Sequence, residues 1–387
     1  MFYGSGSYVA RVSKMHHGSI LLFVAACSST PATTPPNDAG ASDTLQAVDA
    51  ADASPPRSAA CTTQDQQLQA ALDGARKSPN ALLAVKNPAC GNSVYVSGDP
   101  KTAGIDSLWR IGSVTKTYVS ASILSLVQEN KVGLDDLLSK WVPNVKGTTG
   151  VTVKMLLDHR SGIFDYTSDQ AFLVNRSKPW TPQQIVDLAT ASAPYFAPDA
   201  GYHYSNTNYV LLGMILEAAT STKAGVALHA RAIDRAKLTN TLLDGEDTVD
   251  KGRMAHGFTN KVDVTLYGDP TGPWTAGAMV ATGADVTDWI SALYGSDAVL
   301  DAPGRALLVA KTSDLGGGVK YGLGVLLLDA SITAGAGPAM GHNGAIDGFE
   351  TEAFYFAEKK TAIVAVTNKS GVSANDITLA ALVALFP

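Results

Sequence analysis

Apolar positions follow two different periods along the chain, and the changes between them divide it into regions. Repeats of three and four residues predict helices over residues 64–77, 114–130, 154–158, 182–191, 209–220, 286–294 and 375–385. Short apolar or alternating runs predict strands over residues 81–86, 93–98, 321–329, 349–357 and 361–368. Strands near both ends and a long helical middle indicate an α+β fold, with one sheet assembled from both ends of the chain and a helical region inserted between them. A functional site is expected where these two parts meet.

Residues 28–60 contain almost no large apolar side chains. They consist mainly of Pro, Ala, Ser, Thr and Asp, which cannot bury enough apolar surface to offset the entropy of ordering the chain. We therefore expect a disordered tether over residues 27–60 and one folded domain over residues 61–387.

The N-terminus has the features of an export signal. Arg11 and Lys14 precede an apolar stretch at residues 20–26, which ends in small residues directly before Cys27. The stretch resembles a bacterial lipoprotein signal peptide over residues 1–26, in which Cys27 carries the lipid; an ordinary cleaved secretory signal is the alternative. Both predict an exported protein, either a lipoprotein anchored in the bacterial cell envelope or a secreted or periplasmic protein. The sequence has no apolar run of the roughly 18 to 20 residues that a membrane-spanning helix needs, so we expect membrane contact only through the lipid.

Cys61 and Cys90 remain as a pair, which in an oxidising compartment favours a disulfide. The predicted helix over residues 64–77 rises roughly 20 Å, and the strand that follows it returns about 25 Å. This brings Cys90 back to the start of the helix, close to Cys61. Two unrelated buried thiols are the alternative.

Composition excludes several classes of function. The net charge of −6 comes without a long basic run, so we expect no nucleic-acid partner. The histidines and cysteines show no metal-ligand spacing, and we expect neither a metal nor an organic cofactor. A monomer acting on a small peptide-like or ester substrate is the remaining expectation, with peptidoglycan among the candidate substrates.

Ser113 and Lys116 are the first candidates for chemistry. They stand three residues apart where a predicted helix begins, so they share one helix face beside backbone N–H groups that favour developing negative charge. A lysine that loses its hydration there has a lowered pKa and can take the proton of a serine hydroxyl. This Ser-x-x-Lys is the only one in the chain, but about one is expected by chance. A capped helix with a solvent-facing lysine is the alternative.

Tyr204 and Asn206 form the only Tyr-x-Asn of the chain, in a polar turn before the predicted helix over residues 209–220. A tyrosine beside a lysine cation can have a lowered pKa and pass protons, and an asparagine amide can hold a substrate carbonyl. A helix-capping turn with a surface tyrosine is the alternative.

His342, Gly344 and Ala345 belong to a glycine-spaced segment that we expect at the entry to the strand over residues 349–357. Glycines let the backbone approach a ligand closely, and a strand edge there could align a peptide-like substrate. The Ala345 N–H could join the Ser113 N–H in an oxyanion hole. A simple hairpin turn is the alternative.

Taken in order, these segments form the three-motif pattern of the serine penicillin-recognising enzymes. The chain resembles the class C-like branch of the serine beta-lactamase/penicillin-binding protein superfamily. Within that branch it is most similar to the D-alanyl-D-alanine carboxypeptidases, through residues 110–116, 159–166 and 204–208. The resemblance covers residues 62–387.

The resemblance implies both a fold and a set of roles. The fold is an antiparallel sheet of about five strands, flanked by the N- and C-terminal helices and packed against an all-helical region. Ser113 is implied as the nucleophile, Lys116 as its base and Tyr204 as a proton shuttle. Asn206 is implied as a substrate holder and His342 as the basic residue of the third motif. Residues 159–162 are assigned to a structural turn beside the cleft.

Two departures from the carboxypeptidases concern the substrate. Those enzymes grip the peptide carboxylate with an arginine where this chain has Leu326, and they have hydroxyl residues where it has Asn343 and Ala345. Loss of a charged anchor favours neutral esters, amides or internal peptide bonds. The sequence thus predicts a serine hydrolase that forms an acyl-enzyme, of carboxypeptidase or penicillin-binding type on cell-wall peptides. An esterase or class C-like beta-lactamase is the enzymatic alternative, and a slow-releasing beta-lactam-binding or sensor protein is the non-enzymatic one.

Overall fold

The main sheet is assembled from both ends of the chain, as the hydrophobic pattern predicts. The computed structural model describes residues 57–387, in which this sheet has eight strands in the order β2-β1-β13-β12-β11-β10-β9-β8. All neighbouring strands in it are antiparallel. The strands are β1 (Asn80–Asn87), β2 (Gly91–Gly98), β8 (Ser313–Gly316), β9 (Val319–Tyr321), β10 (Leu326–Leu328), β11 (Ala339–Ile346), β12 (Phe349–Phe356) and β13 (Thr361–Thr367). The predicted signal peptide, Cys27 and the predicted tether up to residue 56 lie outside the described residues.

The expected number of about five strands is too low. The predicted strand over residues 321–329 is divided into β9 and β10, because Gly324 turns the chain at a φ of +74° and packs against Ser120. The third motif lies inside a strand of its own, β11, and not at the entry to β12. Glycines and polar residues in β8 and β11 hide the apolar alternation on which strand prediction relies.

Two small sheets accompany the main one. The first has the order β3-β7-β4 and consists of β3 (Trp109–Arg110), β7 (Met279–Ala281) and β4 (Thr241–Leu243). The second is the hairpin of β5 (Phe258–Thr259) and β6 (Val262–Asp263). β3 leads directly into the segment that carries Ser113, so the first small sheet fixes where that segment starts.

The seven predicted helices are present with shifts at their ends. The helices of the described residues are α1 (Ala59–Ala75), α2 (Thr115–Gln128), α3 (Leu138–Trp141), α4 (Val153–Leu157), α5 (Gln170–Leu173), α6 (Pro182–Ala191), α7 (Asn206–Thr220), α8 (Ala224–Leu228), α9 (Trp274–Gly277), α10 (Gly283–Gly295), α11 (Ala302–Val309) and α12 (Asn375–Leu385). Among them, α3, α5, α8, α9 and α11 are additional short helices that the sequence pattern did not predict. α1 begins two residues before the expected domain start at residue 61, because the Ser58 hydroxyl accepts the Cys61 N–H and caps the helix. α6 begins where predicted, at a capping box formed by Thr181 and Gln184.

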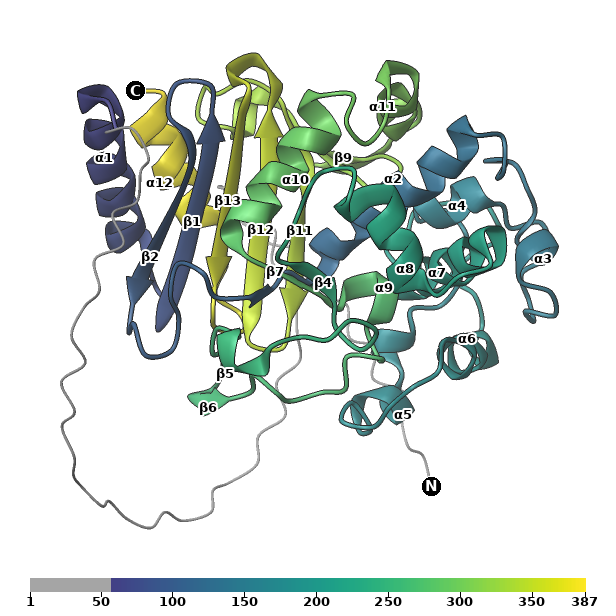
Figure 1. Cartoon of the computed structure of the whole chain (residues 1–387). Helices are drawn as coiled ribbons and strands as arrows, with labels where there is room; N and C mark the ends of the chain where they lie inside the picture. The colour runs from purple at the N-terminus through teal and green to yellow at the C-terminus, as the bar shows by residue number, and fades with distance from the viewer. Residues whose placement is uncertain (1–56) are drawn as a thin grey trace, which may run out of the picture. The chain divides into compact units, whose positions relative to one another are not determined.

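Helices cover both faces of the sheet (Figure 1). α1 and α12 lie on one face, where Leu68 and Leu382 pack around Ile363 of β13. α10 lies on the other face, where Trp289 belongs to the same core as Val364. This second core continues into α2 and α7, so the sheet and the helical region share one interior. Their junction is where the sequence places the functional site.

Cys61 and Cys90 are joined by a disulfide, with their Cα atoms 5.4 Å apart. The bond ties the first turn of α1 to the turn between β1 and β2. The chain reaches this arrangement by the route expected from the sequence, because the strand returns along the helix.

Within residues 57–387, no single helix is both long enough and apolar enough to cross a membrane. α7 and the following segment, Ala224–Ile233, are long and apolar enough only when taken together, and the two are bent by 79° relative to each other.

Candidate active site

Ser113 lies in a short 3-10 turn, η1 (Gly112–Val114), between β3 and α2. Gly112 has a φ of +53°, and a Cβ on it would lie 2.9 Å from the backbone nitrogen of Ala345. Only glycine allows both this backbone conformation and this approach. The serine therefore stands just ahead of the first residue of α2, Thr115, close to where the sequence places it.

Lys116 is completely buried, and its amine lies 2.9 Å from the Ser113 hydroxyl. Nζ donates to Oδ1 of Asn206 at 2.8 Å and to the carbonyl oxygen of Ala276 at 2.6 Å. Both of these oxygens can only accept. A neutral amine has two hydrogens, so these two bonds use both and leave its lone pair facing the Ser113 hydroxyl.

The environment makes this neutral amine available near neutral pH. Burial lowers the pKa of Lys116 to about 7, and the nearby Asp165 carboxylate opposes the shift. The alternative of a solvent-facing lysine is thus wrong, and the amine is placed to accept a proton from Ser113.

Asp165 fixes the orientation of the Asn206 amide. Its carboxylate accepts the Asn206 backbone N–H at 3.1 Å and the side-chain Nδ2 at 3.3 Å. Because a carboxylate accepts only, Nδ2 must face Asp165 and Oδ1 must face Lys116. Thr167 supports the carboxylate with a hydroxyl that donates at 2.8 Å. The contact of Asn206 shown here is with Lys116, and its expected contact with a substrate carbonyl stays a prediction.

Tyr204 donates a hydrogen bond from its hydroxyl to Ser113 Oγ at 2.9 Å. Its ring lies beside the Lys116 amine, with 4.9 Å between Nζ and the ring centroid. Burial nevertheless raises the pKa of Tyr204 well above its usual value. The expectation of a lowered tyrosine pKa is therefore wrong, because burial penalises the phenolate and Lys116 is itself easily deprotonated. Tyr204 is a neutral donor in this site.

Gly344 brings β11 into contact with the Ser113 turn. A Cβ on Gly344 would lie 2.1 Å from the Ile111 carbonyl oxygen and 2.9 Å from the Ser113 nitrogen. Because residue 344 is glycine, the backbone of Ala345 can approach the turn. The Ala345 nitrogen then lies close to Gly112, the residue before Ser113. β10 ends its pairing with β11 at Gly341, so within the described residues the edge of β11 over residues 342–346 has no strand on that side. This edge is free to pair with an extended ligand.

His342 is buried, and its Nε2 lies 3.0 Å from the hydroxyl of Tyr321. Burial, together with the nearby Lys116, lowers the pKa of His342 to about 3. The residue expected to be the basic one of the third motif is therefore uncharged, because the fold places it in the interior.

Leu326 faces away from this site. It pairs with Gly341 and packs on the side of the sheet that α1 and α12 cover, whereas neighbouring His342 points to the opposite side. Leu326 also pairs with Tyr321, whose hydroxyl does reach His342. The effect of the missing arginine on carboxylate recognition stays a prediction.

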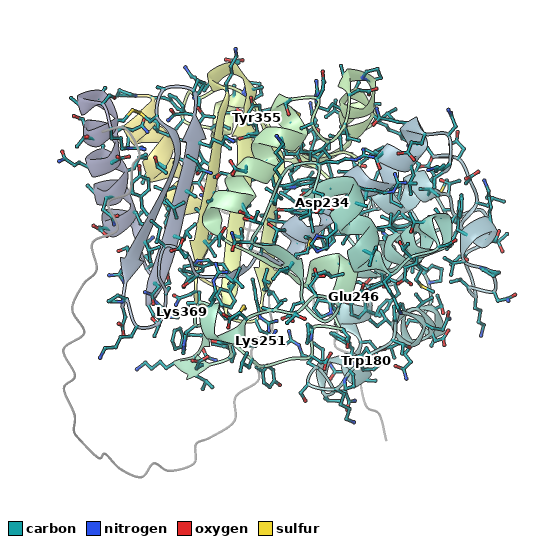
Figure 2. The ribbon with its side chains drawn as sticks, viewed as in Figure 1. Trp180, Asp234, Glu246, Lys251, Tyr355 and Lys369 are labelled. Atoms are coloured by element: carbon teal, nitrogen blue, oxygen red, sulfur yellow. A yellow bond between two sulfur atoms is a disulfide. The ribbon has the colours of Figure 1, made fainter. Side chains whose placement is uncertain are left out.

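Sequence reasoning missed the Ala276 carbonyl. It lies at the end of α9, which is held by a hydrogen bond of 2.6 Å from the Trp274 indole to Glu246, a residue labelled in Figure 2. Every residue has a carbonyl, so no sequence signal marks this one. From the sequence, Asp165 was noted only as part of a family motif. Thr167, two residues later, is the signal that could have marked this carboxylate as a fixed acceptor.

Among the described residues, no group of three or more His, Cys, Asp or Glu could hold a metal ion.

Comparison with known proteins places this geometry in a family. The family model described as Beta-lactamase matches residues 72–386, which is most of the chain. The chain belongs to the Beta-lactamase family. It is thus a serine hydrolase of the serine beta-lactamase and penicillin-binding protein superfamily, with the α+β fold of that group.

The proteins to which this chain is similar include a penicillin-binding protein, an amidohydrolase and an amidase. Penicillin-binding protein 4* of Bacillus subtilis (strain 168) is 25% identical over 284 residues, which cover 68% of this chain and 61% of that protein. The structure of a D-stereospecific amidohydrolase from Streptomyces sp. is 28% identical, with a TM-score of 0.71 over 82% of this chain and 96% of that one. That of D-amino acid amidase from Ochrobactrum anthropi SV3 is 27% identical, with a TM-score of 0.76 over 84% and 98%. This chain therefore covers less than two thirds of the Bacillus protein but nearly all of both solved hydrolases.

Proposed function

We propose that the protein hydrolyses amides and esters of D-amino acids through an acyl-enzyme on Ser113. The observation that carries the proposal is the set of contacts around Lys116, whose two N–H groups are engaged by Asn206 and Ala276. Nζ lies 2.9 Å from Ser113 Oγ, so in the neutral amine the remaining lone pair faces that hydroxyl. A base held in this way activates the serine without a histidine.

The reaction proceeds in two steps. Ser113 Oγ attacks the carbonyl carbon and gives its proton to Lys116. Tyr204 then donates its hydroxyl proton to the leaving nitrogen or oxygen and takes the proton from Lys116, so both groups are neutral in the acyl-enzyme. The oxyanion lies between the N–H groups of Ser113 and Ala345. Water then attacks the acyl-enzyme and gives a proton to Lys116, and the departing Ser113 oxygen takes that proton as the acid is released. Both groups thus return to their neutral forms.

The similar solved structures support the choice of substrate. Both hydrolases with more than a quarter of their residues identical are described as acting on D-configured amino acid derivatives or as D-stereospecific. The neutral His342 also favours substrates without a carboxylate at this edge. A D-alanyl-D-alanine carboxypeptidase is the second candidate, supported by the similarity to penicillin-binding protein 4*.

A substrate panel tests the proposal. Purified protein is incubated with D-phenylalanine amide, its L-isomer, a nitrophenyl ester, a D-Ala-D-Ala peptide and a chromogenic cephalosporin. We expect turnover of the D-amide and the ester, loss of turnover in Ser113→Ala and retention in Ser122→Ala, whose hydroxyl bonds only to its own helix at Tyr118. Turnover of the peptide alone would replace the proposal by the carboxypeptidase. Equal activity of the Ser113→Ala variant on every compound would refute both.

We also propose that the protein is exported, with Cys27 as the lipid attachment site. The disulfide between Cys61 and Cys90 supports an oxidising compartment. Lipid labelling that is sensitive to globomycin and lost in Cys27→Ala is the expected result. Cleavage without lipid would favour the ordinary secretory signal, and retention of the uncleaved chain inside the cell would contradict export.

A further inference from the structure

A chain of hydrogen bonds links the third motif to residues that sequence analysis assigned to structure. The Nε2 of His342 lies 3.0 Å from the Tyr321 hydroxyl, which lies 3.2 Å from Nε2 of His159. The Nδ1 of His159 in turn lies 3.1 Å from the Ser205 backbone nitrogen. At the other end, Nδ1 of His342 bonds to the Asn343 carbonyl. Both histidines and the tyrosine are almost fully buried.

The two ends of the chain fix the direction of every bond in it. The Ser205 N–H only donates, so Nδ1 of His159 accepts, and a neutral His159 carries its proton on Nε2. That Nε2–H donates to the Tyr321 oxygen, and the Tyr321 hydroxyl is then the donor to His342. The Asn343 carbonyl only accepts, so His342 carries its proton on Nδ1 and accepts at Nε2. The two ends require the same direction.

Adding a proton to either histidine breaks this pattern. A proton on Nε2 of His342 would place two N–H donors against the Tyr321 oxygen and leave the hydroxyl of Tyr321 without its acceptor. A proton on Nδ1 of His159 would face the N–H of Ser205. Each change strands a buried donor, which is costly in a protein interior. Burial and the neighbouring Lys116 also lower the pKa of both histidines.

The groups that face the two histidines do not offer a charge that would stabilise their protonated forms. They come from α2 (Lys116), from the segment before α7 (Tyr202, His203 and Tyr204), from α7 (Tyr209) and from β9 (Tyr321). Lys116 and His203 repel a second cation when they are themselves protonated. The carboxylate of Asp158, the residue before His159, is paired with Lys154 at 3.2 Å.

We propose that Tyr321 and His159 are positioning residues that hold His342 as the neutral Nδ1–H tautomer, so that the third motif presents no positive charge to the substrate. This rests on the proposed function and narrows its substrate class. A carboxylate placed beside His342 loses hydration without gaining an ion pair, so the site selects acyl compounds that are uncharged next to the bond being cleaved. His159 is thus more than part of a turn.

Nuclear magnetic resonance on histidine-labelled protein tests the tautomers directly. The nitrogen signals are assigned by their loss in the His159→Gln and His342→Gln variants. The spectra are recorded at pH 7.5 on Ser113→Ala protein, because the measurement does not depend on turnover. We expect a neutral Nε2–H signature for His159 and a neutral Nδ1–H signature for His342. A protonated His342, or its Nε2–H tautomer, would overturn the inference even if the protein is an active hydrolase.

Tyr321→Phe tests the effect on specificity. One D-amino-acid peptide is prepared with a free carboxylate and with a C-terminal amide, and kcat/KM is measured for both. We expect the original protein to prefer the amidated peptide by about tenfold, and Tyr321→Phe to reduce this preference at least about threefold. Loss of a merely structural contact would lower both values equally and leave the ratio unchanged, which would contradict the inference.

Tyr294→Phe is the matched control. Tyr294 is a buried tyrosine of α10 whose hydroxyl has no partner among the described residues. Removing that hydroxyl should leave both the peptide preference and the His342 signals unchanged. If the peptides are not turned over at all, the proposed function fails on these substrates, and the tautomer measurement still decides the inference.

Discussion

At the scale of single residues, the site depends on one amine whose neutral form its surroundings make available near neutral pH. Lys116 has no exposed surface, and its two permanent acceptors, the Asn206 amide and the Ala276 carbonyl, carry no full charge. A carboxylate in either place would stabilise the ammonium and weaken the base. The Asp165 carboxylate lies on the far side of Asn206 from Lys116. There it orients the Asn206 amide, and it opposes the fall in the Lys116 pKa without cancelling it.

The pH dependence of the reaction should report Lys116. Its pKa is about 7, and the free amine is the active form, so kcat/KM should fall about tenfold for each pH unit below that value. The Asp165→Asn variant lacks the carboxylate that raises the Lys116 pKa. The acidic limb of its pH profile, where kcat/KM falls, should therefore move to lower pH. Asp376→Asn, a change on α12 behind the sheet, should leave the limb in place. A limb that moves to higher pH in Asp165→Asn would contradict this assignment.

Local spacing predicts some of these residues and cannot predict others. Ser113 and Lys116 lie three apart on one turn, so the sequence alone brings them together. Tyr204 and His342 were found by the order of the motifs, but their protonation was not, because it depends on burial among groups far away in the sequence. The Ala276 carbonyl lies 160 residues from Lys116 and carries no residue-type signal.

At the scale of elements, the contact between β11 and η1 decides whether an oxyanion can be held. Glycines stand on both sides of it, Gly112 in the turn and Gly344 in the strand. The sequence singles out Gly344 but gives no role to Gly112, and it places Gly344 before a strand, whereas this glycine lies within one. Strand prediction failed here because glycine and polar residues in β11 interrupt the apolar alternation.

Gly344→Ala should disable the site while leaving the rest of the fold intact. The added Cβ would lie 2.1 Å from the Ile111 oxygen, so β11 must move away from the turn, and the Ala345 N–H moves with it. Loss of one oxyanion donor lowers kcat by roughly a hundredfold to a thousandfold. Steady-state kinetics with the nitrophenyl ester would measure this change.

Gly74→Ala provides the control for that substitution. Gly74 lies in α1, and a Cβ there meets nothing within 4 Å. Alanine should leave kcat unchanged and stabilise the helix by about 0.5 to 1 kcal/mol. Full activity in Gly344→Ala would show that the contact of β11 with η1 has no part in the reaction.

At the scale of the whole molecule, the site lies where two structural parts share one core. The sequence predicts this division correctly, because strands occur at both ends of the chain and helices in the middle. It underestimates the sheet, since β8, β9 and β10 are short and contain turns. The faces of the sheet are covered by α1 and α12 on one side and by α10 on the other (Figure 1).

The disulfide stabilises this assembly from a point remote from the site. It ties α1 to the β1–β2 turn across 29 residues of sequence. Replacing both cysteines, in Cys61→Ser with Cys90→Ser, should lower the free energy of unfolding by about 2 to 4 kcal/mol. Urea denaturation followed by circular dichroism would measure it, and kcat at low temperature should stay unchanged. An unchanged denaturation midpoint would show that the bond contributes nothing to stability.

The central claim is that Ser113 carries the acyl group, and the most direct test is the mass of the protein during turnover. A nitrophenyl ester of a D-amino acid is mixed with the protein and quenched in acid, and the adduct is located by peptide mass spectrometry. We predict one acyl group on the peptide that contains Ser113, absent from Ser113→Ala and present in Ser122→Ala. An adduct on another residue, or ester turnover in Ser113→Ala at the original rate, would contradict the account.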